Sequence, residues 1–185
     1  TEDLVLTVTG NLFTDDLAAY PTGIYVLTEI EGVAVPPTGS IFITGTYGTV
    51  EVWANGDYSY VLDNSLVQSF TADDIIPDFF AYKFTEDGFE LNTDLINEIT
   101  GNNDAPVATT KTAAVQEDIT LSATGNVITD DDGFGVDSDI EEQPIGITKV
   151  NDTDLNPVGT TQIVGSFGTL TIDGATGAYT YDLDS

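Results

Sequence analysis

The chain has 185 residues, of which 41% are hydrophobic, so it is long enough for one large domain or two small ones with buried cores. It has 32 acidic residues and only three basic ones, all lysines. The resulting net charge of −29 opposes binding to nucleic acids and to anionic membrane surfaces. The absence of histidine and cysteine excludes serine–histidine and cysteine–histidine triads, the usual zinc, iron and copper sites, and disulfides.

The first feature along the chain is a segment that occurs twice. Residues 2–16 are EDLVLTVTGNLFTDD and residues 117–131 are EDITLSATGNVITDD, with nine of 15 positions identical at an offset of 115. A second pair follows in the same order, because GTYGTVEVWANGDYSYVLDN at 45–64 matches GSFGTLTIDGATGAYTYDLDS at 165–185. Two matched blocks in one order predict a tandem array of one unit.

Alternating apolar and polar residues predict short β-strands within these blocks. Asn55-Gly56-Asp57, between the predicted strands Thr49–Trp53 and Tyr58–Leu62, is typical of a tight hairpin turn. Short strands separated by turns predict an all-β fold of tandem immunoglobulin-like or cadherin-like Greek-key β-sandwiches. The clearest predicted strands are Thr49–Trp53, Tyr58–Leu62, Thr169–Ile172 and Tyr179–Leu183.

Aromatic residues alternate in the first hairpin as Trp53, Tyr58 and Tyr60. Packing in the core and across strands is one interpretation, and a platform that stacks against sugars is the other. Core packing is favoured because Tyr179 and Tyr181 recur at the equivalent positions of the second copy. Trp53 does not recur, and we expect it to be exposed.

The region after this hairpin occurs only once. Phe79, Phe80 and Tyr82 predict a late strand of the first copy, whereas Asn92–Ile99 is compatible with a strand or with one or two helical turns. The Gly, Asn, Asp and Pro residues of 101–106 predict a linker, with a first repeat at 1–104 and a second at 105–185. Because the second repeat has no equivalent of 65–104, we expect a truncated unit, completed by further residues of a longer array or by a neighbouring chain.

The most acidic segment is the loop 130–139, DDDGFGVDSD, with five aspartates and two glycines. Clustered carboxylates repel one another, and oxygen ligands suit hard cations, Ca²⁺ above all. The segment does not have the EF-hand spacing. We expect a calcium site here, and the alternative is a solvated acidic loop that belongs to a solubilising or halophilic surface.

Several motifs together resemble a known family. NDAP at 103–106, VQED at 115–118 and Asp130-x-Asp132 are similar to the linker, N-terminal acid and Asp-x-Asp loop of cadherin-type domains. With GTLTI at 168–172 and GAYTYDLD at 177–184, the chain resembles the VCBS or cadherin-like repeats of large bacterial adhesins of the RTX type. The resemblance implies β-sandwiches, calcium at domain junctions, type I secretion and a role as the extender of a surface adhesin or biofilm protein.

The resemblance also implies which residues bind the ion. In cadherin-type arrays, acids of one domain, the linker and the Asp-x-Asp loop of the next domain converge at the junction. The chain departs from that pattern at Gly101 and Ser65, where those domains have acids. The implied calcium ligands are Glu2, Asp3, Asp63, Asn103, Asp104, Asp130, Asp132, Asp137 and Asp139.

The sequence therefore favours a structural function over a catalytic one. The first expectation is a calcium-stiffened extender segment of a secreted adhesin at the bacterial cell surface, with neighbouring repeats as its partners. A module that binds sugar or peptide ligands of a host or bacterial surface is an alternative, and so is a subunit of a strand-complemented extracellular fibre assembled from identical subunits. We expect no enzyme activity, no insertion into a membrane and no binding to nucleic acid.

Overall fold

The computed structural model describes residues 3–14 and 23–184. The chain divides into two compact units, residues 1–103 (unit 1) and 104–185 (unit 2). The described residues form antiparallel strands and one short 3₁₀ helix, η1 (Asn64–Leu66), which confirms the predicted all-β class. Within the described ranges, no helix combines the length and the apolar character that a membrane span requires.

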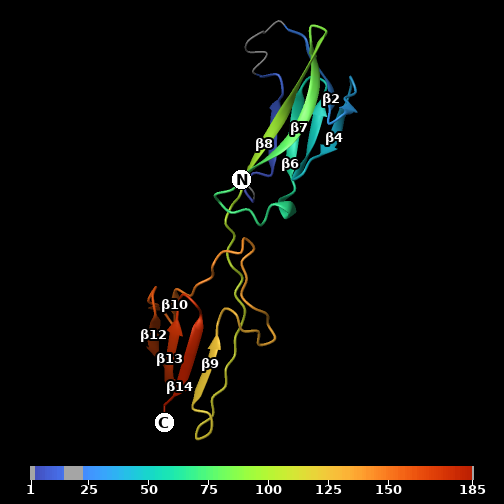
Figure 1. Cartoon of the computed structure of the whole chain (residues 1–185). Coiled ribbons are helices and arrows are strands. Elements are labelled where there is room, and N and C mark those ends of the chain that lie inside the picture. The colour runs from blue at the N-terminus through green and yellow to red at the C-terminus, as the bar shows by residue number, and fades with distance from the viewer. Residues whose placement is uncertain (1–2, 15–22, 185) are drawn as a thin grey trace. The chain divides into compact units, whose positions relative to one another are not determined.

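Unit 1 contains two four-stranded antiparallel sheets, an arrangement consistent with a β-sandwich (Figure 1). The first sheet has the strand order β1-β6-β5-β4, and the second has the order β3-β2-β7-β8. β5 and β6 contain the two predicted strands of the first hairpin, and Gly56 in their turn has φ +85°. The strands are β1 (Thr7–Asn11), β2 (Tyr25–Ile30), β3 (Val33–Ala34), β4 (Ser40–Thr44), β5 (Gly48–Trp53), β6 (Asp57–Leu62), β7 (Ile75–Glu86) and β8 (Phe89–Thr100).

The long β7–β8 hairpin includes the part of the sequence that occurs only once. Its strands pair without interruption from Ile75 opposite Thr100 to Glu86 opposite Phe89. The predicted late strand is confirmed in β7, and the segment 92–99, whose type the sequence left open, lies within β8. Alternation along β7 buries every second side chain, starting at Asp78 and continuing through three aromatic residues.

The core of unit 1 lies between its two sheets. Phe80 and Val50 have no exposed surface, and the Tyr60 ring packs edge-on against Phe80 with 6.0 Å between centroids. Burial of this apolar surface is the main favourable contribution to folding of the unit. The buried core residues are Phe13, Leu27, Ile30, Val35, Val50, Val52, Tyr60, Leu62, Val67, Phe80, Tyr82, Phe84 and Ile99.

A carboxylate is buried in this core. Asp78 on β7 is 1% exposed, and its two oxygens accept hydrogen bonds from the backbone N–H groups of Thr46 (3.0 Å) and Tyr47 (3.1 Å) and from the Tyr60 hydroxyl (2.9 Å). Burial, followed by the hydrogen bond to Asp78 and its charge, raises the pKa of Tyr60 well above its ordinary value. These bonds join the second sheet to the turn between β4 and β5 of the first.

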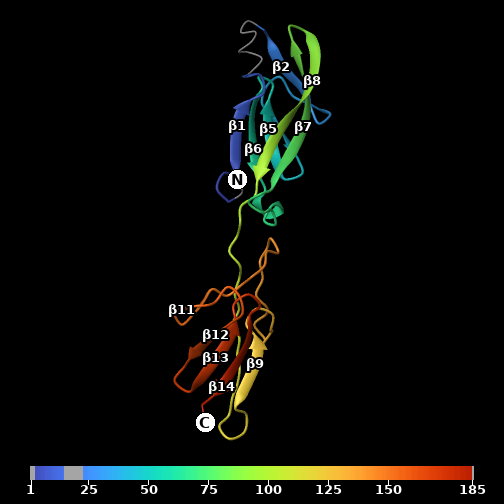
Figure 2. The same cartoon turned by 60° about the vertical axis from the view of Figure 1, so that its left-hand side comes forward.

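Unit 2 has one four-stranded sheet, with the order β12-β13-β14-β9 (Figure 2). A β10–β11 hairpin of two residues per strand lies outside it, and residues 104–184 contain no further strand of more than one residue. The predicted strands at 169–172 and 179–183 are confirmed in β13 and β14. The strands are β9 (Ser122–Asn126), β10 (Lys149–Val150), β11 (Thr153–Asp154), β12 (Thr160–Val164), β13 (Gly168–Asp173) and β14 (Ala178–Leu183).

The sheet of unit 2 matches the first sheet of unit 1 strand by strand. Its order corresponds to β4-β5-β6-β1, and the pair Val8–Tyr60 of unit 1 corresponds to Ala123–Tyr181 of unit 2. The TGN motif common to both copies ends the strand, where the asparagine amide donates to the turn of the neighbouring hairpin: Asn11 to Asn55 O at 3.1 Å and Asn126 to Thr176 O at 2.8 Å.

Candidate functional site

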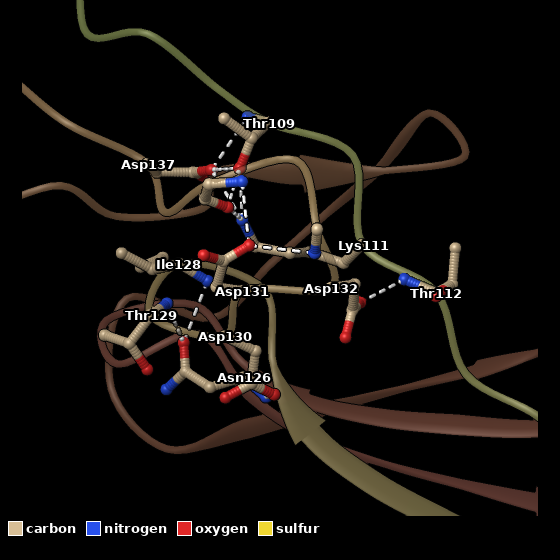
Figure 3. Close-up of polar contacts among 12 residues, drawn as sticks. Thr109, Lys111, Thr112, Asn126, Ile128, Thr129, Asp130, Asp131, Asp132 and Asp137 are labelled. Carbon is tan, nitrogen blue, oxygen red and sulfur yellow. Dashed lines mark hydrogen bonds and ion pairs between the residues drawn. The ribbon is translucent and has the colours of Figure 1, made fainter.

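The acidic loop 130–139 follows β9 and is folded by hydrogen bonds to its own backbone (Figure 3). Asp131 Oδ1 accepts from the N–H groups of Gly133 (2.8 Å) and Gly135 (2.9 Å), and both glycines have positive φ. Asp139 Oδ1 similarly accepts from the N–H groups of Glu141 and Gln143. Because carboxylates accept readily from backbone N–H groups, this local sequence folds into turns.

A lysine from the segment before β9 lies among these acids. Lys111 Nζ is 3.2 Å from Asp137 Oδ1 and 3.0 Å from Gly135 O, and it also contacts the Thr109 hydroxyl (Figure 3). The Lys111 and Asp137 side chains are only 8% and 6% exposed. One of the three cations of the chain therefore forms a buried ion pair with the most acidic loop.

The surroundings of Asp137 stabilise its charged form. The Thr109 N–H, at 2.8 Å, is the main cause that lowers the pKa of Asp137, and the Thr109 hydroxyl and the Lys111 ammonium lower it further, against the effect of burial. The N–H groups of Gly135 and Gly133 lower the pKa of Asp131 in the same way. Both carboxylates are thus held ionised by donors within unit 2.

The Asp-x-Asp pair lies beside β9 and the segment before it. Asp130 Oδ2 accepts from the N–H of Asn126, and Asp132 Oδ2 accepts from the N–H of Thr112, each at 2.5 Å. Burial, followed by the charges of Asp130 and Asp132, raises the pKa of Tyr179 on β14. Both aspartates therefore lie near one tyrosine of the sheet.

The predicted ligands of unit 1 lie around η1. Asp63 caps this helix, with Oδ1 accepting from the N–H (3.1 Å) and hydroxyl (2.6 Å) of Ser65. Asp3 Oδ1 accepts from the Asn64 amide at 2.6 Å, which is the main cause that lowers the pKa of Asp3; the Gln68 and Asn102 amides add to it. Unit 1 thus surrounds Asp3 with amide groups, and Glu2 lies outside the described residues.

The linker residue Asp104 belongs to unit 2. Its N–H donates to Glu141 Oε1 at 2.7 Å, while Glu141 Oε2 is buried and accepts no hydrogen bond from the described residues. Asn103 is the last residue of unit 1. Sequence reasoning missed both Glu141 and Lys111. Lys111 is one of only three cations in a chain of charge −29, but β9 separates it from the acidic loop in the sequence, so no local pattern indicates that the two meet.

Within residues 3–14 and 23–184, no three acidic side chains are grouped closely enough to hold a metal ion. Each carboxylate of the loop has one oxygen that accepts from backbone N–H groups. In Asp137 the same oxygen also lies beside the Lys111 ammonium. In this arrangement they do not form a calcium shell by themselves, and the predicted ligand set stays a prediction. The chain matches no known family profile, nor does any curated protein resemble it significantly.

Proposed function

We propose that the chain is a structural segment of a secreted bacterial adhesin, built from tandem immunoglobulin-like Greek-key units of the VCBS or cadherin-like kind. The observation that supports this function most directly is the matched sheet, in which equivalent residues pair in the same strand order in both units. Repetition of one unit suits a spacer, because each copy adds length without requiring a new fold. Neighbouring repeats are then its partners, and its place is the cell exterior.

Calcium is the second part of the proposal. The Asp-x-Asp loop and the linker acids would supply carboxylate oxygens, and each loop aspartate named above has a second oxygen besides the one that accepts from a backbone N–H. Binding of Ca²⁺ to the folded chain alone would raise its stability by mass action. Since Lys111 already pairs with Asp137, we expect Asp130 and Asp132 to contribute more than Asp137.

The experiment is a calorimetric calcium titration of the chain, with thermal unfolding in calcium and in chelator. The variant is Asp130→Asn with Asp132→Asn, and the matched control is Asp182→Asn, an exposed acid of β14. We expect a calcium-dependent rise in Tm that the double variant loses and the control keeps. Equal melting curves with and without calcium would refute calcium stiffening, while leaving the proposal of a repeated spacer open to scattering measurements of the domain pair.

Ligand binding is a second candidate, supported by a hollow in unit 1. The hollow is lined by residues of β1, β6 and β8, and Asn97 on β8 is 8% exposed with an amide nitrogen that donates to no described residue. A buried donor beside an apolar hollow suits a ligand carbonyl or hydroxyl. Glycan and peptide arrays probed with the chain and with Asn97→Leu test this candidate, which is rejected if both proteins give the same pattern.

A further inference from the structure

The sheet of unit 2 has an apolar face whose counterpart in unit 1 is covered. In unit 1, Val50, Tyr60 and Leu62 are 0%, 3% and 7% exposed beneath the second sheet. Their equivalents Leu170, Tyr181 and Leu183 are only partly buried in unit 2. Residues 104–184 bury just two large apolar side chains to the same degree, Ile163 and Ile172. We call the side chains of Leu170, Tyr179, Tyr181 and Leu183, with Phe167, the open face.

Unit 1 shows what covers such a face. β7 places Asp78 and Phe80 against the first sheet, and Phe70, in the segment before β7, packs edge-on against Tyr47 with 5.5 Å between centroids. Phe167, the equivalent of Tyr47, is 75% exposed in unit 2. The open face therefore corresponds to the surface that β7 and the segment before it cover in unit 1.

The turn that binds Asp78 in unit 1 is also present in unit 2. The Gly45 N–H donates to Gly48 O at 2.7 Å, and the equivalent Gly165 N–H donates to Gly168 O at 2.7 Å. In unit 1, the two residues between these glycines donate their N–H groups to the Asp78 carboxylate. The equivalent N–H groups of Ser166 and Phe167 donate to no acceptor among residues 104–184. Unit 2 thus keeps two backbone donors and the Tyr181 hydroxyl for an incoming carboxylate.

Gly165 supports the same conclusion. A Cβ on Gly45 would lie 2.4 Å from the Phe80 ring and 2.7 Å from Asp78 Oδ2, so β7 requires glycine at this position. A Cβ on Gly165 would meet only Gly168 O, at 3.2 Å, which a small shift relieves. In unit 1 the covering strand β7 explains why position 45 is glycine. In unit 2 no described neighbour requires glycine at position 165, so an absent covering strand of the same kind would explain it.

Among its described residues, the backbone of unit 2 also has an unpaired strand edge. In unit 1, β2 lies between β3 and β7. In the equivalent segment of unit 2, residues 145–150, β10 (Lys149–Val150) pairs with β11 on one side, and no strand among residues 104–184 lies on the other. An edge of this kind accepts an added strand through main-chain hydrogen bonds.

We propose that unit 2 binds a β-hairpin of the β7–β8 type on its open face. The occupant is an antiparallel hairpin whose first strand carries an aspartate followed by aromatic residues at every second position, as Asp78, Phe80, Tyr82 and Phe84 do. Its aspartate accepts from the Ser166 and Phe167 N–H groups and from Tyr181, and its backbone pairs with residues 145–150. This inference depends on the matched sheets and is independent of calcium binding.

The test attaches a second copy of residues 65–103 after Ser185 of the full chain, which is the position equivalent to Asn64. Hydrogen exchange of individual amides is followed by NMR at about 150 mM salt, where repulsion between the acidic parts is screened. We expect exchange at the Ser166 and Phe167 amides and along β13 and β14 to slow by about tenfold or more.

Three matched variants make the test specific. Gly165→Ala should abolish the slowing while leaving the unextended chain folded, because its Cβ fits unit 2 but not the hairpin. Replacing the residue equivalent to Asp78 in the added copy by asparagine should reduce the slowing of exchange. Deletion of the added copy's equivalent of Phe79 should abolish the slowing, since it places the aspartate and the aromatic residues on opposite faces of the strand.

Two results would overturn the proposal. The first is that the added hairpin leaves exchange at these amides unchanged, or that it slows exchange as much in the Gly165→Ala and deletion variants as in the extended chain itself. The other is protection of the same amides in the unextended chain that rises with protein concentration, which would make a second copy of unit 2 the occupant.

Discussion

At the scale of single residues, the buried charged groups of this acidic chain are satisfied in two different ways. Asp78 accepts from two backbone N–H groups and one hydroxyl in the core of unit 1, without a cation. Lys111 instead pairs with Asp137 and a backbone carbonyl oxygen in unit 2. A buried charge costs stability when it is left without such partners, so each site predicts a measurable loss on mutation.

Replacement of Asp78 by asparagine should destabilise unit 1 by about 2–3 kcal/mol, because an amide cannot accept from all three donors as a carboxylate does. Urea unfolding followed by the fluorescence of Trp53, the single tryptophan, measures the stability of unit 1. The control is Asp73→Asn, an exposed acid close by in the sequence, which should change stability by less than about 0.5 kcal/mol. Equal effects of the two substitutions would contradict a specific role of the Asp78 carboxylate.

Lys111→Met should destabilise unit 2 by about 2 kcal/mol, since it leaves the Asp137 carboxylate without its cation. Lys149→Met is the matched control, because Lys149 and Asp154 form an ion pair with side chains 51% and 85% exposed. Such a surface pair contributes about 0.5 kcal/mol or less. Amide exchange in β13 and β14 measures both, and the same loss in both variants would show that burial of the Lys111 pair has no energetic effect.

At the scale of elements, the sequence predicted strands better than it predicted side-chain partners. Alternation identified β5, β6, β13 and β14, because their inward positions are apolar. It could not decide on 92–99, since seven of the eight residues from 89 to 96 are exposed even though β8 pairs along all of β7. Partners such as Lys111 for Asp137 lie 26 residues apart, and composition alone cannot show which distant segment crosses a loop.

The acidic loop should make the stability of unit 2 depend on pH. The pKa of Asp137 is lower in the folded chain than its ordinary value of about 3.9, so the unfolded chain takes up the proton first as the pH falls. This contribution is fully present above the ordinary value and is lost progressively below it.

The measurement is the stability difference between the chain and Asp137→Asn at pH 6 and at pH 3. The difference removes the opposing effect of the lower net charge in acid, which relieves repulsion throughout the molecule. We expect the chain to be more stable than the variant at the higher pH, and the difference to shrink at the lower one. A difference that does not change between the two pH values would contradict this account of the loop.

At the scale of the whole molecule, two units of similar sequence have unequal cores. Thirteen buried residues form the core cluster of unit 1, whereas unit 2 buries two large apolar side chains as deeply among its described residues. Hydrophobic burial scales with apolar area removed from water, so unit 2 should be the less stable of the two. The sequence indicated this inequality, because residues 65–104, which include β7 and β8, have no equivalent in the second copy.

We expect urea to unfold the chain in two transitions, with unit 2 unfolding at the lower concentration. Trp53 fluorescence follows only unit 1, and far-ultraviolet circular dichroism follows both units. The dichroism curve should therefore begin to change before the fluorescence curve does. Coincident curves would show that the two units unfold as one.

The correspondence between the two sheets also has a consequence for the gene. Because the strands pair at equivalent positions in both units, a crossover between the DNA encoding the two TGN segments would join parts of two repeats without shifting any strand register. Such an exchange would keep the pairing of the TGN strand with its neighbouring hairpin in each hybrid unit.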